Sequence, residues 1–138
     1  MQATLCFIGA GNMATSLIGG LIANHYAANS IIANDIDTEK LHSLQQQFSV
    51  RTETDMRPAI ATADIVILSV KPQVMQQVCR SLAQAMPESG QKPLFISIAA
   101  GVRASDINRW LGGEQAVVRC MPNTPALVGL GACALFAN

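Results

Sequence analysis

Segments of two kinds alternate along this chain, and this alternation limits the possible folds more than any other feature. Apolar runs typical of buried strands occupy residues 5–10, 30–34, 63–70, 93–100 and 115–120, with a weaker strand pattern at 50–53. Segments with the apolar spacing of helices lie between them, at residues 13–22, 37–48, 72–86 and 105–111. Helices that separate consecutive strands act as crossover connections. The sequence therefore predicts an α/β fold with a doubly wound, mostly parallel sheet.

Local signals mark where several of these helices begin and end. Asp37 is expected to be the N-cap of the helix that follows it, and Pro72 opens the next helix at its first turn. Ser105 is expected to cap the last helix, which Gly112 and Gly113 would end. Residues 121–129 read as a Pro-rich loop, and 131–137 begin to resemble another strand. Because no linker interrupts this pattern, we expect one domain over residues 1–138.

Composition narrows the classes of function. Half of the 138 residues are apolar and 13% are charged, which is typical of a compact globular domain. Nine basic residues balance nine acidic ones without a basic run, which argues against a nucleic acid or an anionic membrane as partner and favours a small ligand. No apolar stretch reaches the roughly 18 residues of a membrane span, and no charged segment precedes the first apolar run. We therefore expect a cytoplasmic protein.

The sequence predicts no metal site. Cys6, Cys79, Cys120 and Cys133 form no C-x-x-C pair, so we interpret them as thiols of the core. His25 and His42 have no third ligand close in sequence and are interpreted as surface or packing residues.

Three small residues, Gly9, Gly11 and Ala14, stand where the first strand passes into the first helix. In a dinucleotide site, the first glycine permits a tight turn, the second lets the backbone approach a pyrophosphate, and the third small residue lets the helix pack closely. Asn34 and Asp35 end the second strand, about where an acidic residue meets the adenosine ribose. This context favours a Rossmann-type dinucleotide site over a glycine turn that serves packing alone.

Further candidate residues follow other predicted strands, at the sheet edge where open α/β folds bind ligands. They lie in the stretches "SVKPQ" (69–73), "SIAAG" (97–101) and "RCMPNTPALVG" (119–129). Lys71 is either directed into the cleft by Pro72 or an ordinary surface lysine. Ala99 and Ala100 carry little side chain, which suits the close approach of a flat ring.

Four stretches together resemble the N-terminal domain of pyrroline-5-carboxylate reductases: "FIGAGNMA", "ADIVILSVKPQ", "ISIAAG" and "RCMPNTPALVGLGACAL". Related hydroxyacid dehydrogenases share the glycine loop, but the pairing of V-K-P-Q with M-P-N-T-P is characteristic of the reductases. The resemblance implies hydride transfer from reduced NADP or NAD to 1-pyrroline-5-carboxylate, which gives L-proline. It also implies a homo-oligomer for a full-length member.

Together with the strand-end argument, the resemblance gives a set of expected site residues. No catalytic residue is assigned, and Asn123 and Thr124 are expected on the nicotinamide and substrate side. The expected cofactor-binding residues are Ile8, Gly9, Ala10, Gly11, Asn12, Met13, Asn34, Asp35, Ser69, Val70, Lys71, Pro72, Ile98, Ala99 and Ala100.

Two departures from the family pattern bear on these expectations. Asp35 and Met56 stand where members often carry residues compatible with a 2′-phosphate, and a carboxylate repels a phosphate. Asp35 either accepts hydrogen bonds from the ribose hydroxyls of NADH or merely caps the following helix.

The second departure is that the helical domain of the family does not follow Asn138. The chain is then either a truncated reductase or a short protein that only binds a dinucleotide. A related hydroxyacid dehydrogenase domain is a further alternative.

Overall fold

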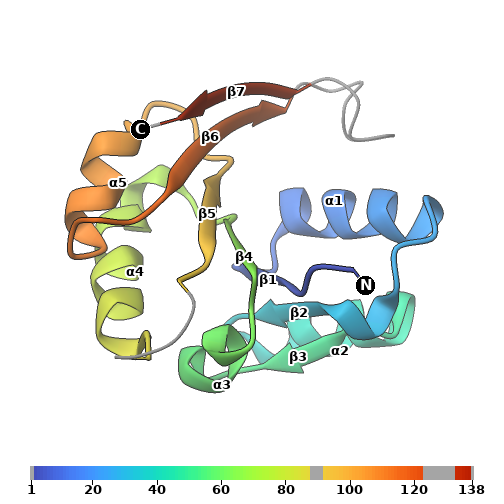
Figure 1. Ribbon diagram of the computed structural model, residues 1–138. Coiled ribbons are helices and arrows are strands. Elements are labelled where there is room, and N and C mark those ends of the chain that lie inside the picture. The colour runs from blue at the N-terminus through green and yellow to red at the C-terminus, as the bar shows by residue number, and fades with distance from the viewer. Residues whose placement is uncertain (1, 88–91, 123–132, 138) are drawn as a thin grey trace.

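The sheet of this protein has seven strands, all within the residues that the computed structural model describes, 2–87, 92–122 and 133–137. Their order across the sheet is β3-β2-β1-β4-β5-β6-β7 (Figure 1). Every neighbouring pair is parallel except β6 and β7, which are antiparallel. The predicted doubly wound, mostly parallel sheet is therefore confirmed. The strands are β1 (Leu5–Ile8), β2 (Ile31–Asn34), β3 (Arg51–Glu53), β4 (Ile65–Leu68), β5 (Leu94–Ser97), β6 (Val117–Pro122) and β7 (Cys133–Ala137).

Helices cover both faces of the sheet (Figure 1). α1 and α2 pack on one face, whereas α3, α4 and α5 pack on the other, and each group has its own hydrophobic cluster. The helices are α1 (Asn12–Ala23), α2 (Thr38–Phe48), α3 (Met56–Ala61), α4 (Pro72–Ala85) and α5 (Ala104–Trp110), and a short 3₁₀ helix, η1 (Ala28–Ser30), precedes β2.

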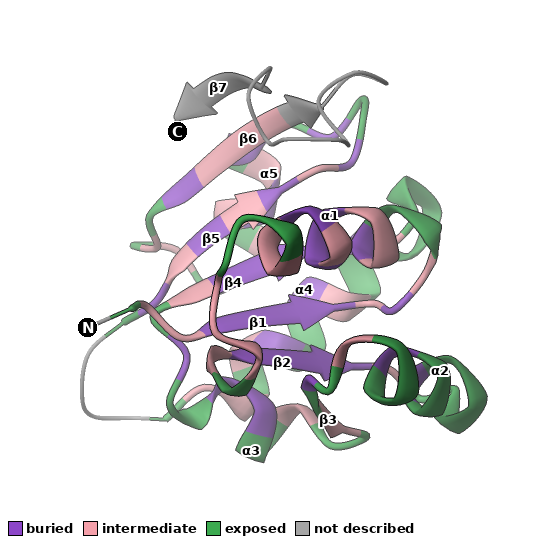
Figure 2. Cartoon of the chain, turned by 90° about the vertical axis from the view of Figure 1, so that its right-hand side faces the viewer, coloured by how far each residue is buried: buried purple, intermediate pink, exposed green. Residues whose placement is uncertain are grey.

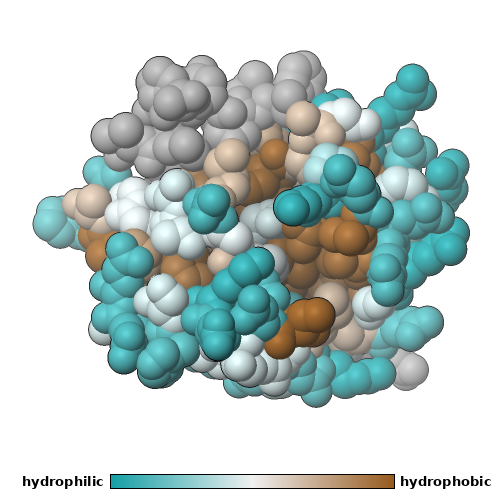
Figure 3. Space-filling model, turned by 180° about the vertical axis from the view of Figure 1, so that it is seen from behind, coloured by the Kyte–Doolittle hydropathy of each residue, from teal (hydrophilic) through white to brown (hydrophobic). Residues whose placement is uncertain are grey.

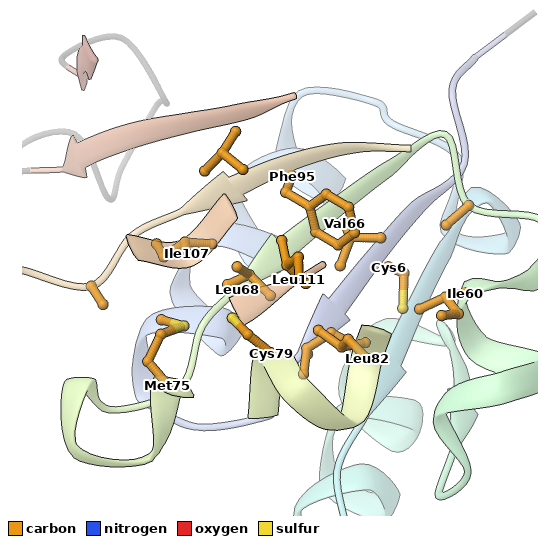
Figure 4. Packing of buried hydrophobic residues seen from close by; sticks show 14 of the residues in the cluster. Cys6, Ile60, Val66, Leu68, Met75, Cys79, Leu82, Phe95, Ile107 and Leu111 are labelled. Atoms are coloured by element: carbon orange, nitrogen blue, oxygen red, sulfur yellow. The ribbon is translucent and has the colours of Figure 1, made fainter. Parts of the chain in front are cut away.

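The core lies along the central strands, which are buried on both faces (Figure 2). In β1, Phe7 packs with the α1 and α2 cluster, while Cys6 and Ile8 pack with the opposite one. This alternation is the two-residue period of a strand, and it explains why β1 is apolar at every position. On the second face, Met75 and Leu82 of α4 are buried in the same cluster as Phe95 of β5 (Figure 4).

Two helix starts agree with the sequence expectation, that of α2 at Asp37 and that of α4 at Pro72, and one differs. Asp37 is the N-cap of α2, as predicted, and accepts hydrogen bonds from the N–H groups of Glu39 and Lys40. Ser105 does not cap α5, because it is the second residue of the helix, whose N-cap is Arg103. Burial of Ala104 explains this earlier start, since it places the first helical residue against the core.

α3 was not expected from the sequence. Its six residues are too few to show a helical apolar period, and Pro58 within them is usually read as a helix breaker. Pro58 is nevertheless in the first turn, where a missing N–H costs no hydrogen bond. Asp55 caps this helix by accepting from the N–H of Arg57 at 3.0 Å.

The cysteines follow the core interpretation only in part. Cys6 and Cys79 are buried free thiols, and burial raises the pKa of each to about 12. Cys120 is instead disulfide-bonded, so its interpretation as a core thiol was wrong. The absence of a C-x-x-C pair, on which that interpretation rested, does not exclude a disulfide. The side chain of Cys133 lies outside the described part of the structure.

Candidate functional site

The candidate site lies where the direction of the chain changes across the centre of the sheet. β1 pairs in parallel with β2 on one side and with β4 on the other. The chain leaves β1 into α1 on one face and leaves β4 into α4 on the opposite face. Such a switch point opens a crevice outside the carboxyl ends of the strands, and ligands of open α/β sheets bind there. Residues 9–11, here called the glycine loop, lie at this point.

Gly9 is required by the packing of the glycine loop. Its φ angle is +101°, a region that side chains disfavour, and an added Cβ would lie 2.7 Å from the carbonyl oxygen of Ser69. Its N–H donates to the carbonyl of Asn34 at 2.8 Å. The loop is therefore held directly against the ends of β2 and β4.

Ser69 strengthens the contact with β4. Its hydroxyl Oγ lies 2.9 Å from the carbonyl oxygens of both Ile8 and Gly9 and can donate to either of them. Its backbone N–H also donates to Ile8 at 2.9 Å. This predicted site residue thus acts inside the protein, on the backbone of the glycine loop.

Gly11 differs from Gly9, because its surroundings are open whereas those of Gly9 are crowded. Its φ is −81°, which any residue can adopt, and nothing lies within 4 Å of an added Cβ. It is the N-cap of α1, whose first turn has no side-chain cap and no acidic residue. α2, by contrast, is capped by Asp37 and carries Glu39 in its first turn. The start of α1 is thus open to an external anion.

Asp35 binds the backbone on both sides of the candidate site. Its Oδ2 accepts from the N–H of Ala10 at 2.8 Å, and its Oδ1 accepts from the N–H of Asp37 at 2.9 Å. The possibility that Asp35 caps the following helix is wrong, because Asp37 fills that position. Asn34, its neighbour, is buried and uses its side-chain amide to donate to Glu53 of β3 at 3.0 Å.

A pocket of about 390 Å³ lies between the glycine loop, the end of β2 and the helices α3 and α4. It brings together five of the predicted cofactor-binding residues and Met56. Its lining residues are Ile8, Gly9, Asn34, Asp35, Ile36, Met56, Val70, Val74, Gln77, Val78 and Ser81. On one face of the molecule, hydrophobic residues are visible among hydrophilic ones (Figure 3).

Sequence reasoning missed the part of this pocket that α4 supplies. Val74, Gln77, Val78 and Ser81 follow the spacing of a single helix face, next to the buried face of Met75, Cys79 and Leu82. The two valines on this otherwise polar face are the sequence signal that could have indicated a pocket wall. The other missed residue, Ile36, is 91% exposed.

A second pocket, of about 480 Å³, adjoins the rest of the glycine loop. It contains the predicted residues Ala10, Gly11 and Asn12 and the first turns of α1 and α2. The residues that complete it are Thr15, Asp37, Glu39, Lys40, Ser43 and Leu44.

The remaining predicted residues that the structure describes line neither pocket. Lys71 and Pro72 are exposed at the start of α4, and Met13 is exposed in α1. Ile98, Ala99 and Ala100 follow β5 at the same sheet edge, where the N–H of Ile98 donates to Leu68 at 3.3 Å. Asn123 and Thr124 lie outside the described residues.

The described part of the chain contains neither a cluster of metal-binding side chains nor a helix able to span a membrane. Across residues 2–87, 92–122 and 133–137, no three His, Cys, Asp or Glu side chains are grouped so that they could hold a metal ion. In the same ranges, no helix has the length and apolarity needed to cross a membrane.

Comparison with known proteins places the chain in a family. Residues 4–101 match the family described as NADP oxidoreductase, coenzyme F420-dependent. The chain is 48% identical over 135 residues to the pyrroline-5-carboxylate reductase of Pseudomonas aeruginosa, an alignment that covers 97% of this chain and 48% of that protein.

Solved structures agree with this placement. The pyrroline-5-carboxylate reductase of Coxiella burnetii is similar over 100% of this chain and 50% of its own, with a TM-score of 0.90 and 41% identity. The enzyme of Plasmodium falciparum, solved with NADP bound, shares the fold with a TM-score of 0.78 and 23% identity over 99% of this chain and 48% of its own. The chain spans about half the length of the curated relatives it matches. It therefore belongs to the NADP oxidoreductase, coenzyme F420-dependent family, and within it resembles pyrroline-5-carboxylate reductases.

Proposed function

We propose that residues 1–138 form one dinucleotide-binding domain that holds reduced NAD or NADP for the reduction of 1-pyrroline-5-carboxylate to L-proline. The observation that carries this proposal is the pairing of Gly11 with the uncapped start of α1. Backbone N–H groups there face open space at the switch point of the sheet, which is the arrangement that binds a pyrophosphate.

The pocket of about 390 Å³ fits the adenosine end of such a ligand. It adjoins Gly9 on one side and is walled by apolar side chains, among them Ile36, Met56 and Val74. A flat base is bound mainly by apolar contact, with a few polar groups to orient it. Gln77 and Ser81 supply polar groups at the α4 wall.

The charges around the ribose position favour NADH over NADPH. Asp35, Asp37 and Glu39 place three carboxylates within five residues, and Lys40 is the only basic residue among the described residues that line the second pocket. A 2′-phosphate would be repelled by this group, whereas free ribose hydroxyls can donate to a carboxylate. We therefore propose that NADH binds at least as well as NADPH.

The dinucleotide, when bound, supplies the hydride for the imine carbon of the substrate. The residues of this chain bind and orient it: the glycine loop holds the phosphates, and the segments after β4 and β5 border the nicotinamide end. Lys71, Ile98, Ala99 and Ala100 belong to that border, and Asn123 and Thr124 complete the proposed substrate side. Positioning of this kind can contribute on the order of 7–11 kcal/mol to a two-reactant step.

The proposal also covers where the protein acts, what it binds and how it assembles. The protein acts in the cytoplasm, on a small-molecule substrate and without nucleic acid, and a chain of the relatives' full length is a homo-oligomer. The similarity to the P. aeruginosa and C. burnetii enzymes supports this choice of reaction over a binding module without catalysis.

A graded series at Gly11 tests the proposal. Because Gly11 has ordinary backbone angles and free space around it, Gly11→Ala and Gly11→Val should fold normally. Calorimetry should show NADH binding that weakens with side-chain size, by about tenfold or more for Gly11→Val. Ala61→Val, at an exposed position outside both pockets, is the matched control and should bind as the wild type does. Unchanged affinity in a folded Gly11→Val protein would remove the glycine loop from the site.

A further inference from the structure

We propose that Asp35 is a positioning residue that holds the glycine loop in its binding conformation before any dinucleotide arrives. The inference rests on the proposed function, since it concerns the same site, but it assigns Asp35 a role that precedes contact with the ribose.

The hydrogen bonds of the carboxylate carry the inference. One oxygen accepts from Ala10, inside the glycine loop, at 2.8 Å, and the other accepts from Asp37, at the start of α2, at 2.9 Å. The carboxylate therefore ties the loop after β1 to the turn after β2. Hydrogen bonds to a charged acceptor are stronger than those between neutral groups, so this tie limits movement of the loop.

The tie also divides the N–H groups of the loop between two tasks. The N–H of Gly9 donates to the carbonyl of Asn34, and the N–H of Ala10 donates to the carboxylate of Asp35, so neither N–H remains for a ligand. A pyrophosphate must then bind to N–H groups from Gly11 onward, at the uncapped start of α1. Asp35 thereby fixes which part of the backbone meets the phosphates.

The ribose is not excluded by this arrangement. Each carboxylate oxygen has two acceptor positions, and each accepts one hydrogen bond from the protein. Ribose hydroxyls can use the remaining positions, provided that the carboxylate stays where it is. A 2′-phosphate would instead have to displace it, which would also release the glycine loop. The positioning role and the preference for NADH thus have one cause.

Hydrogen exchange in the protein without ligand tests the tie directly. The amide of Ala10 should be protected in the wild type, and NMR should show it exchanging about tenfold faster or more in Asp35→Asn and Asp35→Ser. Asn has the shape of Asp but only one acceptor oxygen, so it can serve only one of the two N–H groups. Asp37→Asn is the matched control, because it removes a neighbouring charge, keeps a good N-cap and leaves both hydrogen bonds of Asp35 in place.

Either of two results in this experiment would overturn the inference. One is an Ala10 amide that is unprotected in the wild type, which needs no variant to fold. The other is unchanged protection in a folded Asp35→Ser protein, which lacks the carboxylate altogether.

A second measurement separates positioning from ribose contact. The probe is an NADH analogue whose adenosine ribose lacks both hydroxyls, and binding is measured by calorimetry. If Asp35 acts through the loop, Asp35→Ser weakens binding of this analogue by about tenfold, as the loss of charge-assisted hydrogen bonds predicts. Equal binding by wild type and Asp35→Ser would show that Asp35 acts on the ribose alone and would refute the inference. A wild-type protein that binds neither NADH nor NADPH would refute the proposed function, while the exchange experiment would still test the tie.

Discussion

At the scale of single residues, Gly9 and Gly11 should respond differently to substitution although they are two positions apart. Gly9→Ala would put a methyl group 2.7 Å from the Ser69 carbonyl at a positive φ, so it should lower the free energy of unfolding by about 1–3 kcal/mol. Gly11→Ala should lower this free energy less, by about 1 kcal/mol at most, because its surroundings are open and only the preference for Gly at the N-cap is lost. Urea denaturation of both variants checks this contrast, and equal losses would contradict it.

The buried thiols of Cys6 and Cys79 predict an alkaline loss of stability. Burial raises the pKa of each from 9.0 to about 12, so the folded state keeps thiol protons that the unfolded chain releases. The stabilisation is complete below pH 9 and should be lost as pH rises from about 9 to about 12.

The free energy of unfolding, measured across that pH range, should fall less steeply in Cys79→Ala than in the wild type. The slope is the readout because the cavity left by Ala lowers stability at every pH. Identical slopes would mean that the Cys79 thiol is not the source.

At the scale of elements, α4 serves the core with one face and the pocket with the next. Val74 is 41% exposed and lines the pocket, so Val74→Ser should weaken NADH binding by up to about tenfold with little effect on the fold. Reduced nicotinamide mononucleotide, which lacks the adenosine, should bind both proteins equally. Gln76→Ser, exposed on the same helix but outside this pocket, is the control. Equal weakening of both ligands would place Val74 away from the adenosine.

Elements with strong local signals were predictable from the sequence, whereas contacts between them were not. β4 and α4 follow clear apolar patterns, and Asp37 has the local chemistry of an N-cap, so all three were expected. α3 is too short to show a period.

In the candidate site, too, local features could be predicted and contacts between distant residues could not. The glycine turn at Gly9 and Gly11 could be predicted because its residues are adjacent in sequence. The hydrogen bond from Ala10 to Asp35 joins residues 25 apart, and no local pattern announces it. The α4 wall of the pocket depends on how the helix is rotated against the sheet, which only packing decides.

At the scale of the whole molecule, the chain spans about half the length of its relatives, and the proposed reaction needs both partners held together. Residues 1–138 alone should therefore bind NADH but form little proline. A chimera in which they replace the matching half of the P. aeruginosa reductase should be active. Robust proline formation by the purified 138-residue chain, checked by mass, would show that it contains the complete active site.

The same chimera tests the nicotinamide border. Lys71 is exposed after β4 and lines neither pocket, so Lys71→Ala should lower kcat more than it lowers affinity for NADH. Steady-state kinetics and calorimetry on one preparation measure both quantities. Equal losses, or none, would assign Lys71 to the surface.

The hydrogen bond between Ser69 and Ile8 has a consequence for the order of assembly. It joins residues 61 apart, and β1 pairs with β4 over a similar separation, so a large loop must close before the glycine loop is held in place. A nascent chain that has emerged only as far as α3 has the whole glycine motif and β2 but lacks β4 and Ser69, which hold the other side of the loop. The ability to bind NADH should therefore form together with the global fold. During refolding, NADH binding should not recover faster than the fluorescence of Trp110 in α5.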